Sequence, residues 1–176
     1  MDMITIRAAR PADLDAVGRV HVDAWRHAYR GVVPPSFLDR MDPAVSAERF
    51  KRRLADPRQA FWVALEGEDV VGFASGGPSR LEDFDADAEI YTLYVSPSWH
   101  RRGIGRSLVR QLADWFAEEG HHSVVVVTFR DNPWRRFYER LGAVVIGEKV
   151  FEIDGAVLPE VVYGWPNVAD LRRRAT

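Results

Sequence analysis

The segment from Glu89 to Phe129 constrains the fold of this chain more than any other, because three consecutive patterns follow one another in it. Glu89–Val95 is predicted to be a strand, Gly103–Glu119 has the apolar spacing of an amphipathic helix, and Ser123–Phe129 is a valine-rich run typical of a strand buried on both faces. Two strands joined by a helix form a parallel crossover unit. The sequence therefore predicts an α/β domain with parallel pairing in its sheet.

Antiparallel elements are predicted on both sides of this crossover unit. Two short turns, Gly67–Asp69 and Asp154–Gly155, each separate a pair of apolar runs, which is the pattern of a hairpin. The remaining elements are a strand at Met3–Arg7, a helix after Pro11 with Leu14, Val17, His21, Ala24 and Ala28 on one face, a helix at Ala44–Leu54, strands at Phe61–Glu66 and Val70–Ser75, a short helix at Pro133–Leu141, and strands at Val144–Ile153 and Val157–Tyr163.

The chain has 176 residues, about the size of one ordinary domain, and no repeat or linker divides it. We therefore expect a single domain over residues 1–176, with its core at about 4–163. Its fold class is expected to be α/β, with a mixed sheet of about seven strands and flanking helices. The chain is expected to close on an edge hairpin, and the basic tail Leu171–Thr176 is expected to be frayed and solvated.

Composition limits the classes of partner. With 24 basic and 26 acidic residues the formal charge is -2, so the chain lacks the cationic field that attracts nucleic acids or anionic membranes. It has no cysteine, which removes disulfides, thiolate metal sites and a cysteine nucleophile. It also lacks an apolar run long enough for a membrane helix or a signal peptide. A soluble cytoplasmic protein with no nucleic-acid or membrane partner is expected, and a homodimer is left open.

The turn between the first strand of the crossover unit and its helix has the chemistry of an anion site. Backbone N–H groups converge at a helix N-terminus, where the helix dipole is positive. Gly103 and Gly105 leave room for a phosphate, and Arg101, Arg102 and Arg106 add positive charge that suits a pyrophosphate. The alternative explanation is a glycine-rich turn followed by a solvated, basic start of a helix.

Two common phosphate-binding motifs fit this turn poorly. The chain has no G-x-x-x-x-G-K-[ST] run, so P-loop nucleotide hydrolysis is not predicted. A dinucleotide-binding fingerprint would need a third glycine where Leu108 stands, and a shorter connection from Val95 to Gly103. An oxidoreductase of the dinucleotide-binding type stays a weaker hypothesis.

A third motif accounts for more of the sequence. The run HRRGIG at His100–Gly105 resembles the [QR]-x-x-G-x-[GA] pyrophosphate signature of the GNAT superfamily of acyl-CoA-dependent N-acetyltransferases, with His100 in place of Gln or Arg. Asn132–Gly142 resembles the family segment N-x-x-A-x-x-F-Y-E-x-L-G-F, with Arg135 in place of a small residue and Ala143 in place of Phe. Together with the order of elements, the resemblance covers about Ile4–Tyr163.

The resemblance implies acetyl-CoA as cosubstrate and no metal. Family members bind the pyrophosphate mostly through backbone N–H groups, so His100 should weaken side-chain support without abolishing the site. In the family, the strand before the glycine turn splays from its neighbour and offers main-chain groups to the pantetheine and thioester. Asn132 matches a family residue that binds the pantetheine, although Asn–Pro is also common turn chemistry. The cofactor-binding residues implied are Leu93, Tyr94, Val95, His100, Arg101, Arg102, Gly103, Ile104, Gly105, Arg106, Asn132, Phe137 and Tyr138.

The same resemblance implies two catalytic residues, because acetyl transfer to an amine needs a base for the amine and an acid for the departing thiolate. Glu89 stands where many family members have a glutamate that deprotonates the acceptor through water, and strand alternation places it on one face with Tyr91 and Leu93. Tyr138 stands where the family has a tyrosine that reaches the CoA sulfur. The alternatives are a solvent-facing Glu89, with Asp87 or Tyr91 as base, and Tyr138 as a core aromatic.

Trp25 and Tyr29, four residues apart on the first helix, indicate either core packing or, from the resemblance, contact with the acceptor. The acidic loop Leu81–Glu89 lacks the glycine and final glutamate of a calcium loop, so it is either a solvated segment or a rim that attracts a cationic amine. We expect an N-acetyltransferase that acts directly on a small-molecule or peptide amine in a ternary complex, since no cysteine can carry the acyl group. The alternative is a catalytically silent acyl-CoA-binding module or sensor.

Overall fold

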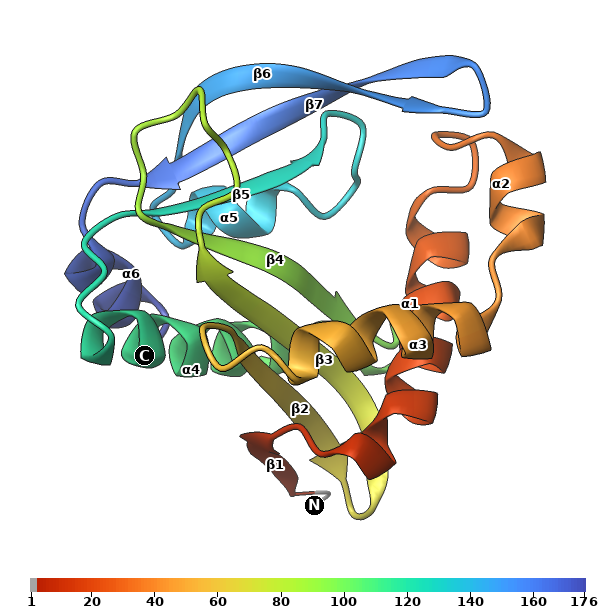
Figure 1. Ribbon diagram of the computed structural model, residues 1–176, viewed down its shortest axis with the longest axis horizontal. Coiled ribbons are helices and arrows are strands. Elements are labelled where there is room, and N and C mark those ends of the chain that lie inside the picture. The colour runs from red at the N-terminus through yellow and green to blue at the C-terminus, as the bar shows by residue number, and fades with distance from the viewer. Residues whose placement is uncertain (1–2) are drawn as a thin grey trace.

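One seven-stranded sheet, flanked by helices, forms the computed structural model, which describes residues 3–176 (Figure 1). The strands are β1 (Ile4–Ala8), β2 (Ala60–Glu66), β3 (Asp69–Pro78), β4 (Ala88–Val95), β5 (Val124–Phe129), β6 (Val144–Ile153) and β7 (Ala156–Trp165). The helices are α1 (Leu14–Ala28), α2 (Pro35–Arg40), α3 (Pro43–Leu54), α4 (Ile104–Glu118), α5 (Arg136–Arg140) and α6 (Val168–Arg174), with short 3₁₀ turns at Pro11–Asp13 and Pro97–Trp99.

The strand order is β1-β2-β3-β4-β5-β7-β6. Strands β4 and β5 pair in parallel and are joined through α4, which confirms the crossover unit predicted from the sequence. Every other neighbouring pair in the described sheet is antiparallel, including both predicted hairpins. The predicted fold class, a mixed sheet of about seven strands with flanking helices, is thus confirmed.

The two faces of the sheet are covered by different helices. Leu108, Leu112 and Phe116 recur every four residues along α4, so they form one apolar stripe that is fully buried against one face. Helices α1 and α3 cover the opposite face over β2 and β3, where Val17, Phe50 and Phe73 pack into a second apolar cluster. The crossover helix and the N-terminal helices therefore lie on opposite sides of the central strands.

The C-terminal tail differs from its prediction. Residues 168–174 form α6, in which Leu171 is fully buried, and Ala175 after it is also buried. Arg172 Nε lies 2.8 Å from Asp114 Oδ1 of α4. The prediction of a frayed tail is therefore wrong, whereas the side chains of Arg172, Arg173 and Arg174 are exposed as predicted. The prediction that the chain closes on the edge hairpin is also wrong, although β6 is an edge strand of the sheet.

Candidate active site

The centre of the sheet opens between its two parallel strands. Residues Ala88–Ile90 of β4 pair with Val124–Val126 of β5, and no further pairs join the two strands. Beyond Ile90, β4 runs on to Val95 while β5 runs on to Phe129. The main chain of Leu93–Val95 therefore has no strand partner on the β5 side. This is the splay that the family resemblance implied.

A β-bulge in β4 changes which of its side chains share a face. Ser75 of β3 pairs with Thr92, whereas the next residue, Gly76, pairs with Ile90. Tyr91 is therefore an extra residue on β4, and such an insertion reverses the alternation of side chains along the strand.

The bulge places Glu89 and Leu93 on opposite faces. Leu93 packs against the core below α4, whereas Glu89 lines a cavity together with Tyr91 and Tyr94. The prediction that Glu89 shares a face with Leu93 is wrong for this reason, while the predicted grouping of Glu89 with Tyr91 agrees with the structure.

The cavity that Glu89 lines has a volume of about 270 Å³. We call it the central cavity. Trp25 and Tyr29 both line it, and the Trp25 indole Nε1 donates a hydrogen bond of 2.9 Å to the Tyr94 hydroxyl. Its lining comes from α1 (His21, Trp25, Tyr29), α3 (Arg49, Phe50, Arg53), the loop after β3 (Arg80), β4 (Glu89, Ile90, Tyr91, Thr92, Tyr94), β5 (Val127, Thr128, Phe129) and the edge hairpin (Phe151, Glu160).

Glu89 is buried, with 3% of its surface exposed, so a solvent-facing carboxylate is excluded. Arg80 Nη2 lies 2.7 Å from Glu89 Oε2, and the Arg80 backbone N donates a 2.9 Å hydrogen bond to Oε1. Asp87, an alternative base, instead accepts hydrogen bonds of 2.8 Å from the backbone N of His122 and of Ser123, outside the central cavity. Glu89 is thus the better placed of these two carboxylates.

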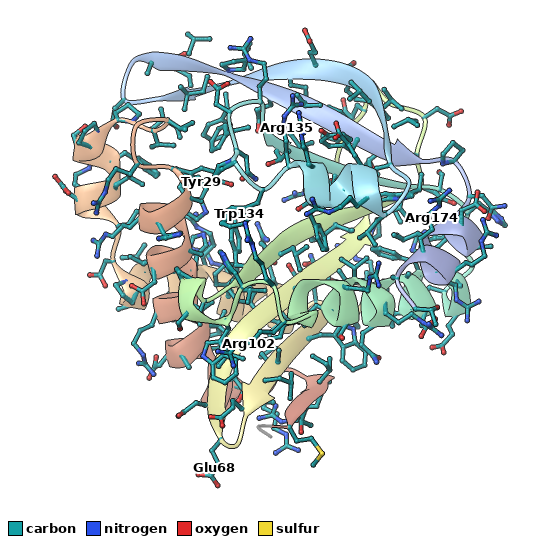
Figure 2. The ribbon with its side chains drawn as sticks, turned by 180° about the vertical axis from the view of Figure 1, so that it is seen from behind. Tyr29, Glu68, Arg102, Trp134, Arg135 and Arg174 are labelled. Carbon is teal, nitrogen blue, oxygen red and sulfur yellow. The ribbon has the colours of Figure 1, made fainter. Side chains whose placement is uncertain are left out.

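The glycine turn has the backbone of an anion cradle. Gly103 caps α4 with a φ of 79°, a left-handed conformation that favours glycine, and Arg101 adopts a φ of 63° just before it. The side chains of Arg101, Arg102 and Arg106 are exposed around this helix start. Arg102 stacks on Trp99, with its Cζ 4.4 Å from the ring centroid. Figure 2 shows Arg102 and Trp134 on the same face of the molecule.

Gly105 has a different role from Gly103. A Cβ added at Gly105 would lie 3.5 Å from the Phe137 ring, which is ordinary contact, whereas one at Gly103 would meet nothing within 4 Å. The space between Gly105 and Phe137 therefore has room for a methyl group and little more, whereas Gly103 supplies the backbone conformation of the turn.

His100 connects the glycine turn to the end of β4. Its Nε2 donates a 2.9 Å hydrogen bond to the Val95 carbonyl oxygen, which fixes the proton on that nitrogen. Its ring meets Trp134 edge to face, with centroids 4.6 Å apart. The substitution of Gln or Arg by His at this motif position therefore leaves a side chain that holds the turn in place.

Asn132 forms the turn that follows β5. Its Oδ1 accepts a 2.9 Å hydrogen bond from Trp134 N, and its Nδ2 donates a 2.8 Å hydrogen bond to Thr128 Oγ1. Because of this side-chain turn, α5 begins only at Arg136 and is shorter than the predicted Pro133–Leu141 helix. Arg135, labelled in Figure 2, directs its Nη1 to the Tyr163 hydroxyl at 3.3 Å.

Tyr138 is buried on α5, with 8% of its surface exposed. Its ring lies 5.4 Å from that of Phe137 and 5.8 Å from that of Tyr163. Within residues 3–176, no hydrogen bond engages its hydroxyl. Burial, together with the nearby Tyr94 and Tyr163 hydroxyls, raises the pKa of Tyr138 well above its usual value. The phenol is therefore neutral and keeps a proton that it could donate.

The sequence interpretation did not identify several charged or titratable residues of the central cavity. Arg49, Arg53 and Glu160 are the main examples, and the last had a recognisable signal because it interrupts an otherwise apolar strand. Burial raises the pKa of the Glu160 carboxyl, which Lys149 partly offsets. The sequence predicts His21 only as part of an apolar helix face, whereas in the structure its Nδ1 shares a 2.9 Å hydrogen bond with Ser46.

Within residues 3–176, no three His, Asp or Glu side chains lie close enough together to hold a metal ion. In the same part of the chain, no helix is both long and apolar enough to cross a membrane.

Comparisons with known proteins agree with this geometry. Residues 22–143 match the acetyltransferase (GNAT) family. The chain is 33% identical over 170 residues to the uncharacterized N-acetyltransferase YuaI of Bacillus subtilis, covering 97% of each protein. It is 34% identical over 110 residues to the N-alpha-acetyltransferase RimI of Mycobacterium tuberculosis, covering 61% of this chain and 67% of that relative.

Solved structures share the fold at lower identity. The structure of yncA from Salmonella typhimurium with its cofactor acetyl-CoA has a TM-score of 0.72 at 24% identity, and the match covers 93% of this chain and 94% of that one. The PaiA N-acetyltransferase from Thermoplasma acidophilum in complex with coenzyme A has a TM-score of 0.65 at 19% identity, covering 90% and 98%.

Proposed function

Because this chain belongs to the GNAT family of acetyltransferases, we propose that it transfers the acetyl group of acetyl-CoA directly to a primary amine in a ternary complex. The observation that supports this proposal is the opening between β4 and β5. On its β4 side, the strand runs from Glu89 in the wall of the central cavity to Val95, whose carbonyl oxygen accepts a hydrogen bond from His100 of the glycine turn. Family membership and the names of the relatives support acetyl transfer in general. The primary amine and the direct mechanism are our proposal.

The residues around the opening fit a CoA-like molecule. The backbone N–H groups at the start of α4 would bind the pyrophosphate, with Arg101, Arg102 and Arg106 around them. The Trp134 indole Nε1 is buried beside His100 and has no hydrogen-bond partner within residues 3–176. A buried donor of this kind normally has an acceptor, and the amide carbonyls of a pantetheine arm are acceptors. On the β5 side, where no strand pairs with β4 beyond Ile90, the main chain of Leu93 and Tyr94 offers further groups to the same arm.

The proposed chemistry assigns one proton to each catalytic residue. Glu89 accepts a proton from the acceptor ammonium, through water, and the free amine attacks the thioester carbonyl. A C–N bond forms, the C–S bond breaks, and the thiolate receives a proton from the Tyr138 hydroxyl. The second proton, which the attacking nitrogen loses as it becomes an amide, returns through water to the Tyr138 phenolate and restores the phenol. The paired Arg80 holds the Glu89 carboxylate in the wall of the central cavity. With no cysteine in the chain, the thiol route to an acyl-enzyme is closed.

A Glu89→Gln variant tests this assignment. We expect turnover to fall most at low pH, where an unassisted amine is almost wholly protonated, and to recover partly as pH rises. Acetyl-CoA affinity should stay nearly unchanged. The measurement is the rate of CoA release across pH with a panel of primary amines, beside an Asp87→Asn control. A pH profile like that of the wild type would move the base elsewhere, with Tyr91 as the next residue to test.

The runner-up function is a silent acyl-CoA-binding module or sensor, which the substitutions at His100 and Arg135 keep open. Isothermal titration with acetyl-CoA and with NAD separates both candidates from a dinucleotide-binding oxidoreductase, and the assay of CoA release separates the enzyme from the sensor. We expect acetyl-CoA to bind and NAD not to bind, and a wild-type chain that binds acetyl-CoA but releases no CoA with any amine would favour the sensor. A cytoplasmic location and a homodimer stay predictions.

A further inference from the structure

The α3 side of the central cavity contains a guanidinium nitrogen without a partner. Arg53 Nη1 is buried and makes no hydrogen bond to any group in residues 3–176. Its Cζ lies 5.6 Å from the Phe50 ring centroid and 5.7 Å from that of Tyr91, so aromatic faces hold the cation without satisfying its donors. A buried charged donor is costly unless an acceptor completes it.

The positive charge on this side is not neutralised by the described part of the chain. Arg49 and Arg53 are four residues apart on α3, line the same cavity, and form no ion pair within residues 3–176. Like charges at this spacing repel each other along a helix. The third arginine, Arg80, is occupied by Glu89 at 2.7 Å. Burial and the neighbouring Arg80 lower the pKa of Arg53.

The other residues that line the central cavity suit a small molecule that has an apolar part and an amine. Aromatic side chains surround the cavity, among them Trp25, Tyr29 and Phe129. Glu160 on β7 adds a carboxylate. In the strand order, β7 lies two strands from β4 on one side, whereas α3 lies over β2 and β3 on the other side. The cavity is therefore basic on its α3 side and acidic on its β7 side. Its volume of about 270 Å³ lies just below the range of about 300–1,000 Å³ that is usual for ligand sites, which favours a small acceptor.

We propose that the acceptor is a small amine that carries a carboxylate, of amino-acid size, and that Arg53, with Arg49 beside it, binds the carboxylate. This inference rests on the proposed acetyl transfer and names its substrate class. A planar guanidinium matches a carboxylate with two parallel hydrogen bonds, which a neutral amine or amide cannot accept in the same way. Binding at α3 leaves the amine free to point toward Glu89 and the opening between β4 and β5.

The test compares matched pairs of acceptors. Rates of CoA release are measured at saturating acetyl-CoA for L-phenylalanine, L-methionine and L-glutamate, each beside its α-carboxamide. The amine of the amide is less basic, so more of it is unprotonated at neutral pH and its intrinsic reactivity opposes the expected preference. We expect kcat/KM at least about tenfold higher for at least one acid than for its amide, a ratio that corresponds to about 1.4 kcal/mol.

Variants of α3 assign the preference to Arg53. Arg53→Gln should lower kcat/KM for the preferred acid at least about tenfold, mainly through KM, and leave its amide within about threefold. Arg53→Lys keeps the positive charge but lacks the planar guanidinium. Its kcat/KM for the preferred acid should lie between the values of the wild type and of Arg53→Gln. Arg52→Gln is the matched control, because Arg52 is the adjacent residue of α3, is exposed and does not line the central cavity. Thermal unfolding of each variant checks that it is folded.

The outcomes separate this inference from the proposed function. Acetylation of amines with no preference for acids, preference for the N-terminus of a peptide amide, or equal losses for acid and amide in Arg53→Gln and Arg53→Lys would each overturn the carboxylate-bearing acceptor and leave acetyl transfer standing. A wild type that binds acetyl-CoA and acetylates no amine at all would overturn both.

Discussion

The Tyr138 hydroxyl is the group whose removal should separate chemistry from binding. A Tyr138→Phe change keeps the buried ring beside Phe137 and deletes one proton donor. We expect kcat to fall by about 10²–10⁴-fold, the usual contribution of a general acid, while acetyl-CoA affinity stays within a few-fold. Steady-state kinetics and isothermal titration measure the two quantities.

Tyr163→Phe is the matched control for this change. The Tyr163 ring lies 5.8 Å from that of Tyr138, it is fully buried, and it does not line the central cavity. Its hydroxyl donates to Glu139 Oε1 at 3.1 Å, so its loss should cost about 1 kcal/mol of stability with kcat nearly unchanged. Normal turnover in Tyr138→Phe would leave Tyr138 as a core aromatic.

His21 makes the stability of the fold depend on pH. Burial, with Arg49 and Arg53 nearby, lowers its pKa from 6.5 to about 4, so the imidazole is neutral in the folded state. Between these two values the unfolded chain binds more protons, and the free energy of unfolding therefore falls as pH is lowered through this window. At pH 4.5 the loss attributable to His21 should be about 2–3 kcal/mol, since each pKa unit is worth about 1.4 kcal/mol.

Urea unfolding of the wild type and of His21→Gln, at pH 7 and pH 4.5, measures this contribution. Acidic groups such as Asp13 also lose ion pairs in acid, so only the difference between the two slopes reports on His21. The variant should have the flatter dependence on pH. Parallel slopes would mean that the imidazole is protonated in the folded state as well.

The first turn of α4 should tolerate a methyl group and reject a branched side chain at Gly105. Alanine would place its Cβ in ordinary contact with Phe137, at 3.5 Å, and should bind acetyl-CoA within a few-fold of the wild type. Valine would push its two methyl groups against that ring and stiffen the turn, so affinity should fall more than about tenfold. Gly155→Ala, at the tip of the edge hairpin, is the control, and equal affinities for Gly105→Val and wild type would remove the phosphate-cradle interpretation.

Elements with an apolar pattern of their own were predictable from the sequence. Elements that are stabilised mainly by packing on a neighbouring element were not. The valine run of β5 and the stripe of Leu108, Leu112 and Phe116 each indicate their own burial, so the crossover unit was predicted correctly. The basic tail contains only Leu171 as a strong apolar signal, and its helix is stabilised by α4, through Arg172 and Asp114. The local signal for α6 is Asn167, whose side-chain Oδ1 caps the helix by accepting a 2.9 Å hydrogen bond from Ala169 N.

The same distinction applies to the candidate site. The glycine turn could be located because its residues are contiguous in the sequence. The bulge at Tyr91 could not, because it depends on how β4 pairs with β3 and leaves no mark in β4 itself. The cluster of Arg49, Arg53 and Arg80 likewise comes from two separate segments that meet only in the folded chain.

Across the sheet, the junction of β4 and β5 is the weakest seam, since three residue pairs hold it together and antiparallel pairing joins the strands on either side. Acetyl-CoA bound in the opening should therefore stabilise the fold, by about 2.7 kcal/mol at one hundred times its dissociation constant. Amide exchange should slow most in peptides from β4 and β5, and the unfolding temperature should rise. NAD at the same concentration is the control, and an acetyl-CoA effect no larger than that of NAD would contradict the expectation.

If acetyl-CoA binds across the central seam as proposed, the lifetime of the protein should depend on metabolic supply. With acetyl-CoA abundant, the two halves of the sheet should stay joined and the chain should resist proteases, which cleave transiently opened states. With acetyl-CoA scarce, the open fraction should grow and degradation should become faster. The splay between β4 and β5 would then make the amount of enzyme, as well as its rate, follow the availability of the acyl donor.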